Sequence, residues 1–182
     1  MPTNDSRLLR AELLSFDADP GDDDTPAPGS VVHHPDGALW LENGRIRAVG
    51  DYATLAPDLP PGLEVIDHRG KLITPGFIDS HVHYVQLEIM ASYGRQLLDW
   101  LNDYTFPEEQ QFASREHADA LSEAFLDEML RVGTTTAQVF CSSHPVSVDA
   151  FFAASQRRGL CMLAGKVLMD RHAPEGLTDD TL

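Results

Sequence analysis

Three features are scarce or absent in this sequence of 182 residues. It contains only two cysteines, Cys141 and Cys161, with no CxxC pair, so we expect reduced core thiols rather than a disulfide. It has no uncharged apolar run of about 18 residues, so no membrane span is predicted. The N-terminal residues lack both the apolar region of a signal peptide and the Arg-rich character of a transit peptide. We therefore expect a cytoplasmic protein without a membrane partner.

Basic residues are also few, with 13 Lys and Arg against 29 Asp and Glu and a formal net charge of -16. No Lys/Arg cluster is present, which argues against a nucleic-acid partner because such binding needs a basic surface. Part of the acidic excess is local: in residues 17–29 five aspartates stand among prolines and glycines. This composition is typical of a solvated loop. An EF-hand calcium site is not predicted, because the spacing and the closing Glu are missing.

The pattern of apolar residues divides the chain into two predicted domains. Residues 1–70 are interpreted as short strands separated by turns, and Asn43-Gly44 between two apolar runs predicts a two-residue hairpin. From residue 71 to residue 182 strands alternate with amphipathic helices, which is typical of βαβ units in a parallel sheet.

The predicted elements of the second domain are ordered strand, helix, strand, helix, strand. A strand over 72–83 is followed by a long polar and aromatic loop over 84–112. A helix with Ser114 as N-cap ends near Gly133. The last elements are a buried strand at 134–140, a helix over about 147–158 that ends at Gly159, and a buried strand over 160–169.

The length of this second domain limits its architecture. A (β/α)8 barrel takes ~250 residues, whereas about 110 follow the β-rich part, which is room for about three βα units. The segment is therefore either an open three-stranded sheet or the front portion of a barrel in a longer protein. We favour the second interpretation.

Two histidines spaced by one residue end the first strand of this domain. Side chains alternate along a strand, so Asp79, His81 and His83 share one face and the two imidazoles can converge on one metal ion. They also lie at the carboxyl end of a parallel strand, where barrel enzymes carry their active sites. Asp79 either orients the site through hydrogen bonds or is a strand-end residue.

The stretch "PGFIDSHVH" resembles the metal motif of the amidohydrolase superfamily. Within that superfamily, "HVHYVQ", "ASYGRQLLDWLNDYTFPEEQQF", "RVGTTTAQVF" and "AGKVLMDRHAPEGL" are similar to the guanine deaminase family, from about Lys71 to the end of the chain. "LWLENGRIRAVG" resembles the small β-sandwich that precedes the barrel in these enzymes. The fold class implied is α/β: the start of an amidohydrolase (β/α)8 barrel, incomplete in this chain, after a β-sandwich portion.

The resemblance implies a hydrolase that uses one Zn2+ per site to convert guanine to xanthine and ammonia. It makes His81 and His83 metal ligands, and Gln86 with the backbone around Tyr84 and Val85 a purine-recognition segment. It also suggests a homodimer and places the general acid and the remaining metal ligands beyond Leu182. The residues predicted to contact substrate are His83, Tyr84, Val85, Gln86 and Trp100, with Leu98 and Phe106 as further candidates for the apolar wall.

Other interpretations remain open at this point. The chain could act on a different nucleobase-like ring, or it could be an inactive structural fragment. His144, after the second barrel strand, either touches substrate or caps the next helix. Glu88, His117 and Lys166 are interpreted as structural.

Overall fold

The structure, a computed structural model, describes residues 5–94 and 96–179. Contacts between residues divide the chain into two compact units, Met1–Pro75 and Gly76–Leu182, and each is described by itself. The division falls after Pro75, whereas we expected it at about residue 70. The difference arises because the strand that starts at Glu64 continues to Ile73 within the first sheet.

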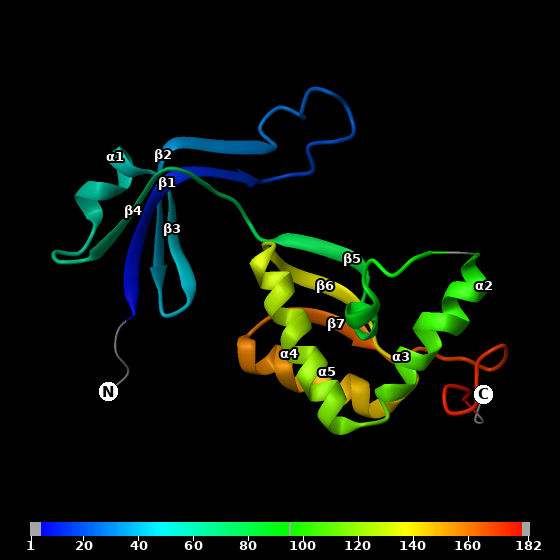
Figure 1. The fold of residues 1–182 in the computed structure, drawn as a ribbon. Coiled ribbons are helices and arrows are strands. Elements are labelled where there is room, and N and C mark those ends of the chain that lie inside the picture. The colour runs from blue at the N-terminus through cyan, green and yellow to red at the C-terminus, as the bar shows by residue number, and fades with distance from the viewer. Residues whose placement is uncertain (1–4, 95, 180–182) are drawn as a thin grey trace. The chain divides into compact units, whose positions relative to one another are not determined.

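The first unit is a four-stranded sheet in the order β3-β2-β1-β4 (Figure 1). Neighbouring strands are antiparallel except for the parallel pair β1 and β4. The strands are β1 (Ser6–Phe16), β2 (Val31–Glu42), β3 (Arg45–Asp51) and β4 (Glu64–Ile73), with the short helices α1 (Tyr52–Leu55) and η1 (Ala56–Asp58) before β4.

Two turns of the first unit agree with the sequence prediction. Asn43 and Gly44 connect β2 to β3 with φ values of 52° and 74°, the positive values that a tight hairpin of two central residues requires. Residues 17–29 form an irregular and largely exposed connection between β1 and β2. The hairpin and the solvated acidic loop are thus confirmed. In the described residues this unit has one sheet, so the expected β-sandwich stays a prediction.

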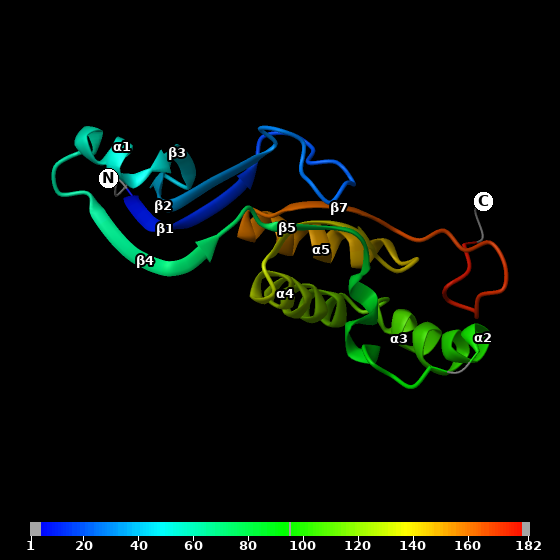
Figure 2. The same ribbon diagram turned by 90° about the horizontal axis from the view of Figure 1, so that it is seen from above.

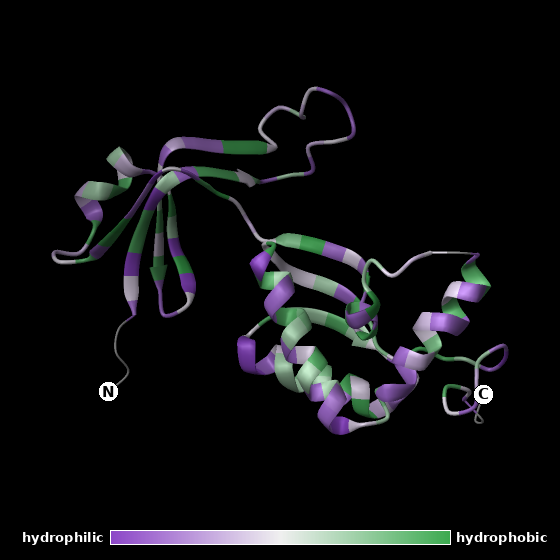
Figure 3. Ribbon diagram, in the orientation of Figure 1, coloured by the Kyte–Doolittle hydropathy of each residue, from purple (hydrophilic) through white to green (hydrophobic). Residues whose placement is uncertain are grey.

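The second unit contains a parallel three-stranded sheet in the order β5-β6-β7. Figure 2 shows the two long helices packed on one side of these strands, and the buried apolar residues of both helices form one core with those of the sheet. Figure 3 shows that β5 begins apolar and becomes polar toward its carboxyl end. The elements are β5 (Phe77–His83), α4 (Arg115–Arg131), β6 (Thr134–Phe140), α5 (Pro145–Arg158) and β7 (Cys161–Gly165).

The ends of both helices follow the sequence signals. Ser114 is the N-cap of α4, and its hydroxyl accepts a hydrogen bond from the backbone N–H of His117. Gly159 closes α5 in the left-handed conformation with φ 66°. These two caps and a strand at 134–140 are confirmed, but this strand is only partly buried, because Thr135 and Gln138 are exposed. None of the helices in the described residues combines the length and the apolar character needed to cross a bilayer.

The region between β5 and α4 differs from the prediction of a loop. It contains η2 (Tyr84–Ile89), α2 (Leu97–Trp100), a π-helical stretch η3 (Leu101–Thr105) and α3 (Phe106–Gln111). Its residues are mostly polar or aromatic and lack a clear apolar stripe, which is why periodicity failed here. Pro107 lies in the first turn of α3, directly after the π-helical stretch η3, and because proline has no backbone N–H it donates no helical hydrogen bond there.

The last strand also differs from the prediction of a fully buried strand. Met162 and Ala164 pack against the helices, whereas Cys161 and Leu163 are exposed. Successive side chains of a strand point to opposite faces, and only one face of this sheet is covered in the described residues. Both cysteines are free, as expected, but only Cys141 is a core thiol; placing Cys161 in the core was wrong.

Candidate functional site

A cavity of about 340 Å³ opens at the carboxyl end of β5, within the second unit. It collects residues from β5 and from the segment that follows. Four of the residues predicted from the sequence line it together: His81, His83, Gln86 and Trp100. The remaining lining residues are Val82, Leu87, Ile89, Met90, Ala91, Ser92 and Phe125.

The two histidines bring a pair of imidazole rings to this cavity. Their ring centroids lie 5.4 Å apart, and the ring of Phe140 lies 4.9 Å from His81 and 4.7 Å from His83. His83 and Phe140 are register partners on β5 and β6, which explains the stacking. Burial, and then the neighbouring His81, lower the pKa of His83. Both effects favour the neutral imidazole, which is the form that binds metals.

Asp79 acts on the backbone of the same strand. Its Oδ1 accepts a hydrogen bond of 3.0 Å from the backbone N–H of His81. The pairing of β5 with β6 shifts register between Asp79 and Val82. The carboxylate therefore supports the irregular strand that carries the histidines.

The histidine nitrogens at the cavity suit a metal ion. His83 Nδ1 is buried and has no hydrogen-bond partner among the described residues. A buried nitrogen of this kind is costly unless something satisfies it. Two neighbouring imidazoles are a donor pair that suits zinc. The residues fit such an ion.

The next predicted residues separate into core and cavity positions. Tyr84 and Val85 have fully buried side chains, and the Tyr84 hydroxyl donates a hydrogen bond of 2.7 Å to the backbone carbonyl of Ser147. Neither residue is among those that line the cavity, so a contact between their backbone and a substrate stays a prediction. Gln86 lines the cavity, and its Nε2 donates to Glu109 Oε1 at 3.3 Å.

The apolar wall of the cavity is only partly as predicted. Trp100 lines it, and the indole Nε1 donates a hydrogen bond of 3.0 Å to Ser92 Oγ. Leu98 and Phe106 do not line it, and Leu98 is 71% exposed. Leu87 and Met90 line the cavity instead. These two were missed because the helical turn η2, which brings them beside the histidines, was interpreted as a loop.

Sequence reasoning also missed Glu109 and Phe140. Glu109 lies in α3, which no periodicity indicated, and it is 5% exposed. Phe140 ends the predicted strand next to β5, so its place beside His83 follows from the parallel register. The pairing of Phe140 with His83 could have been inferred from the sequence, whereas the burial of Glu109 could not.

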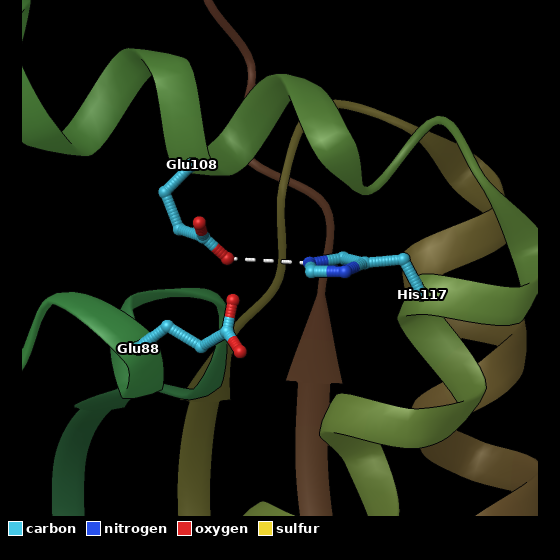
Figure 4. A group of neighbouring side chains, drawn as sticks. All are labelled: Glu88, Glu108 and His117. Carbon is cyan, nitrogen blue, oxygen red and sulfur yellow. Dashed lines mark hydrogen bonds and ion pairs between the residues drawn. The ribbon is translucent and has the colours of Figure 1, made fainter.

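A second group of titratable side chains lies outside the cavity lining. Figure 4 shows Glu88, Glu108 and His117, whose ligand-type atoms all lie within 4.8 Å of one another. His117 Nε2 is 3.2 Å from Glu108 Oε1, and Gln111 donates to Glu108 Oε2 at 2.7 Å. Burial first, and the neighbouring Glu88 second, raise the pKa of Glu108.

His144 and Lys166 lie after β6 and β7, at the carboxyl end of the sheet. His144 is the N-cap residue of α5 by position, but its side chain makes no capping bond, and its Nε2 is buried without a partner among the described residues. Burial and the charge of Lys166 lower the pKa of His144. Lys166 pairs with Asp179 and donates to the Ser143 carbonyl at 3.3 Å, in agreement with a structural role.

Known proteins resemble this chain in sequence and in structure. The family described as "Amidohydrolase family" matches residues 72–181. The guanine deaminase of Escherichia coli (strain K12) is 46% identical over 144 residues, which cover 79% of this chain and 33% of that protein.

Two solved structures extend the resemblance to the fold. The structure described as "E. coli Guanine Deaminase" superimposes with a TM-score of 0.87 and 39% identity, over 95% of this chain and 40% of the other. A guanine deaminase from C. acetobutylicum with bound guanine in the active site gives a TM-score of 0.76 and 27% identity, over 96% of this chain and 39% of that one. The fold matches the N-terminal portion of these enzymes, so the predicted fold class is confirmed. The chain spans about 33% to 40% of the length of these relatives.

Proposed function

Because the chain belongs to the amidohydrolase family, we propose that it forms the N-terminal part of the active site of a zinc-dependent guanine deaminase. The similarity to guanine deaminases supports this substrate. The observation that carries the proposal is that His81, His83, Gln86 and Trp100 line one and the same cavity. Cytoplasmic location and homodimer formation are part of the same proposal.

The residues of this chain take separate roles in the proposed reaction. His81 and His83 hold the zinc ion, and bound zinc supplies the Lewis-acid chemistry that makes water nucleophilic near neutral pH. Phe140 packs against both imidazoles and limits their rotation. The carboxamide of Gln86 offers a donor and an acceptor to the polar edge of the base. Trp100 and Met90 cover its apolar faces. We assign no general acid to the described residues.

The test uses the full-length gene product that contains this chain, assayed for conversion of guanine to xanthine and for zinc content. His81→Ala and His83→Ala each remove a metal ligand, so both should lose turnover together with most of the zinc. Gln86→Ala should keep its zinc but lose about tenfold to a hundredfold in kcat/KM, because deleting one buried hydrogen-bonding group costs about 1 to 3 kcal/mol.

His33→Ala is the matched control. His33 lies in the first unit and contacts Glu12 at 2.8 Å, so its loss should leave both zinc content and turnover unchanged. Full zinc retention in His81→Ala would contradict the metal assignment. Full guanine activity in Gln86→Ala would contradict the assignment of base recognition.

A further inference from the structure

The amide of Gln86 connects the cavity to a buried carboxyl group behind it. Gln86 lines the cavity, whereas Glu109 does not. Gln86 Nε2 donates to Glu109 Oε1 at 3.3 Å, from η2 to α3. Glu109 is 5% exposed. The Gln86 amide therefore links the cavity to the carboxyl group of Glu109, which does not itself line the cavity.

Burying a carboxyl group in this place is unfavourable for folding. Transfer of a carboxylate out of water is strongly unfavourable unless partners compensate for the lost hydration. A neutral amide at 3.3 Å compensates only in part. In agreement with this, burial raises the pKa of Glu109, and the hydrogen bond from Gln86 lowers it by less. Costly buried groups of this kind are frequent at functional sites.

The chemistry of a carboxylate decides which way the amide points. An ionised carboxylate only accepts hydrogen bonds, whereas a carboxamide has a donor end and an acceptor end. The structure places the nitrogen of Gln86 toward Glu109, and an ionised Glu109 maintains this orientation because it cannot donate. The carbonyl oxygen of Gln86 is then the end available to the cavity. That oxygen accepts a hydrogen bond from an N–H group, which the ring and amino nitrogens of guanine provide.

We propose that Glu109 is a positioning residue that fixes the orientation of the Gln86 amide, so that its carbonyl oxygen meets an N–H donor of the bound base. This inference rests on the proposed function, which it extends from Gln86 to the group that holds it. The adjacent residue Glu108 is the natural comparison. It is also buried in α3, at 6% exposure, but it pairs with His117 and Gln111 instead of Gln86.

The kinetic test is a double-mutant cycle in the full-length gene product. Glu109→Gln keeps the shape of the side chain, but the new carboxamide can both donate and accept hydrogen bonds. The Gln86 amide can then take either orientation. We expect KM for guanine to rise about tenfold, with kcat within about twofold and zinc content unchanged. In a Gln86→Ala background the same substitution should change kcat/KM by no more than about twofold. Glu108→Gln should leave the kinetics as in the wild type.

Stability separates positioning from a structural role. Because the buried carboxyl group is unfavourable, Glu109→Gln and Glu109→Met should match or exceed the thermal stability of the wild type while KM rises. A fall in thermal stability, or failure of both variants to fold, would overturn the proposal. So would an equal loss of kcat/KM in the wild-type and Gln86→Ala backgrounds.

A readout that does not need turnover separates this proposal from the proposed function. The side-chain amide resonance of Gln86, identified by its disappearance in Gln86→Met, should move in Glu109→Gln and stay in place in Glu108→Gln. If the wild type fails to deaminate guanine but this shift is observed, the substrate is wrong and the positioning contact stands. If the resonance does not move, the positioning proposal is wrong whatever the substrate.

Discussion

His83 and Phe140 stack with ring centroids 4.7 Å apart and an interplanar angle of 16°. They are register partners on neighbouring parallel strands, so the contact is a direct result of the pairing of β5 with β6. The same phenylalanine ring lies 4.9 Å from His81. Phe140 on β6 thus packs against both imidazoles of β5.

The contact predicts an effect of Phe140→Ala on metal affinity. Without the ring both imidazoles gain rotational freedom, so zinc affinity of the full-length gene product should fall about tenfold. Competition with a chromophoric chelator measures this. Phe152→Ala, which removes a 42% exposed ring of α5, is the control and should leave the affinity unchanged. Equal affinities in the two variants would show that the stack does not support the metal site.

A second prediction concerns the glycine that precedes β5. A Cβ atom at Gly76 would lie 2.0 Å from Thr135 Oγ1, far inside contact distance. Gly76→Ala should therefore lower the free energy of unfolding by about 3 kcal/mol, as an overpacked site does. Gly165→Ala is the matched control, since a Cβ atom there would have no neighbour within 4 Å and the change should cost less than about 0.5 kcal/mol. Denaturant titration of both variants checks this, and equal stabilities would contradict the steric argument.

A third prediction concerns the pH dependence of stability at Glu88 and Glu108. The pKa of Glu108 is raised above its ordinary value of 4.5. The folded state therefore holds this proton more tightly than the unfolded state. The stabilising contribution is fully present below about pH 4.5 and is lost as the pH rises through the folded pKa.

Glu88→Gln removes the neighbouring carboxylate that contributes to this shift. The variant should therefore lose less stability than the wild type when the pH rises from acid to neutral. Its melting temperature should be about 2 °C higher than that of the wild type at neutral pH and nearly the same in acid. Melting curves across this range measure the effect. Glu116→Gln, an exposed change on α4, is the control. An equal gain at every pH would mean that repulsion from Glu88 is not the cause.

The sequence by itself determined the features that depend on local geometry. Alternation along a strand places His81 and His83 on one side, and the structure brings them together at the cavity. The Asn43-Gly44 hairpin and the Gly159 helix end were predictable because each needs a left-handed backbone that few residues adopt. The resemblance carried by "HVHYVQ" and the later motifs indicated the fold class and the proposed substrate.

Only the tertiary structure decided which side chains surround the histidines. Residues 84–112 carry no clear apolar period, so the helices there, and the burial of Glu109 behind Gln86, follow from the packing of α3 on η2 and of η2 on α4. Cys161 has an apolar neighbourhood in sequence but is exposed in the structure, because only one face of β7 is covered in the described residues. Local patterns specify a backbone conformation, whereas burial depends on residues that are distant in sequence, and the pairing of Gln86 with Glu109 is of that second kind.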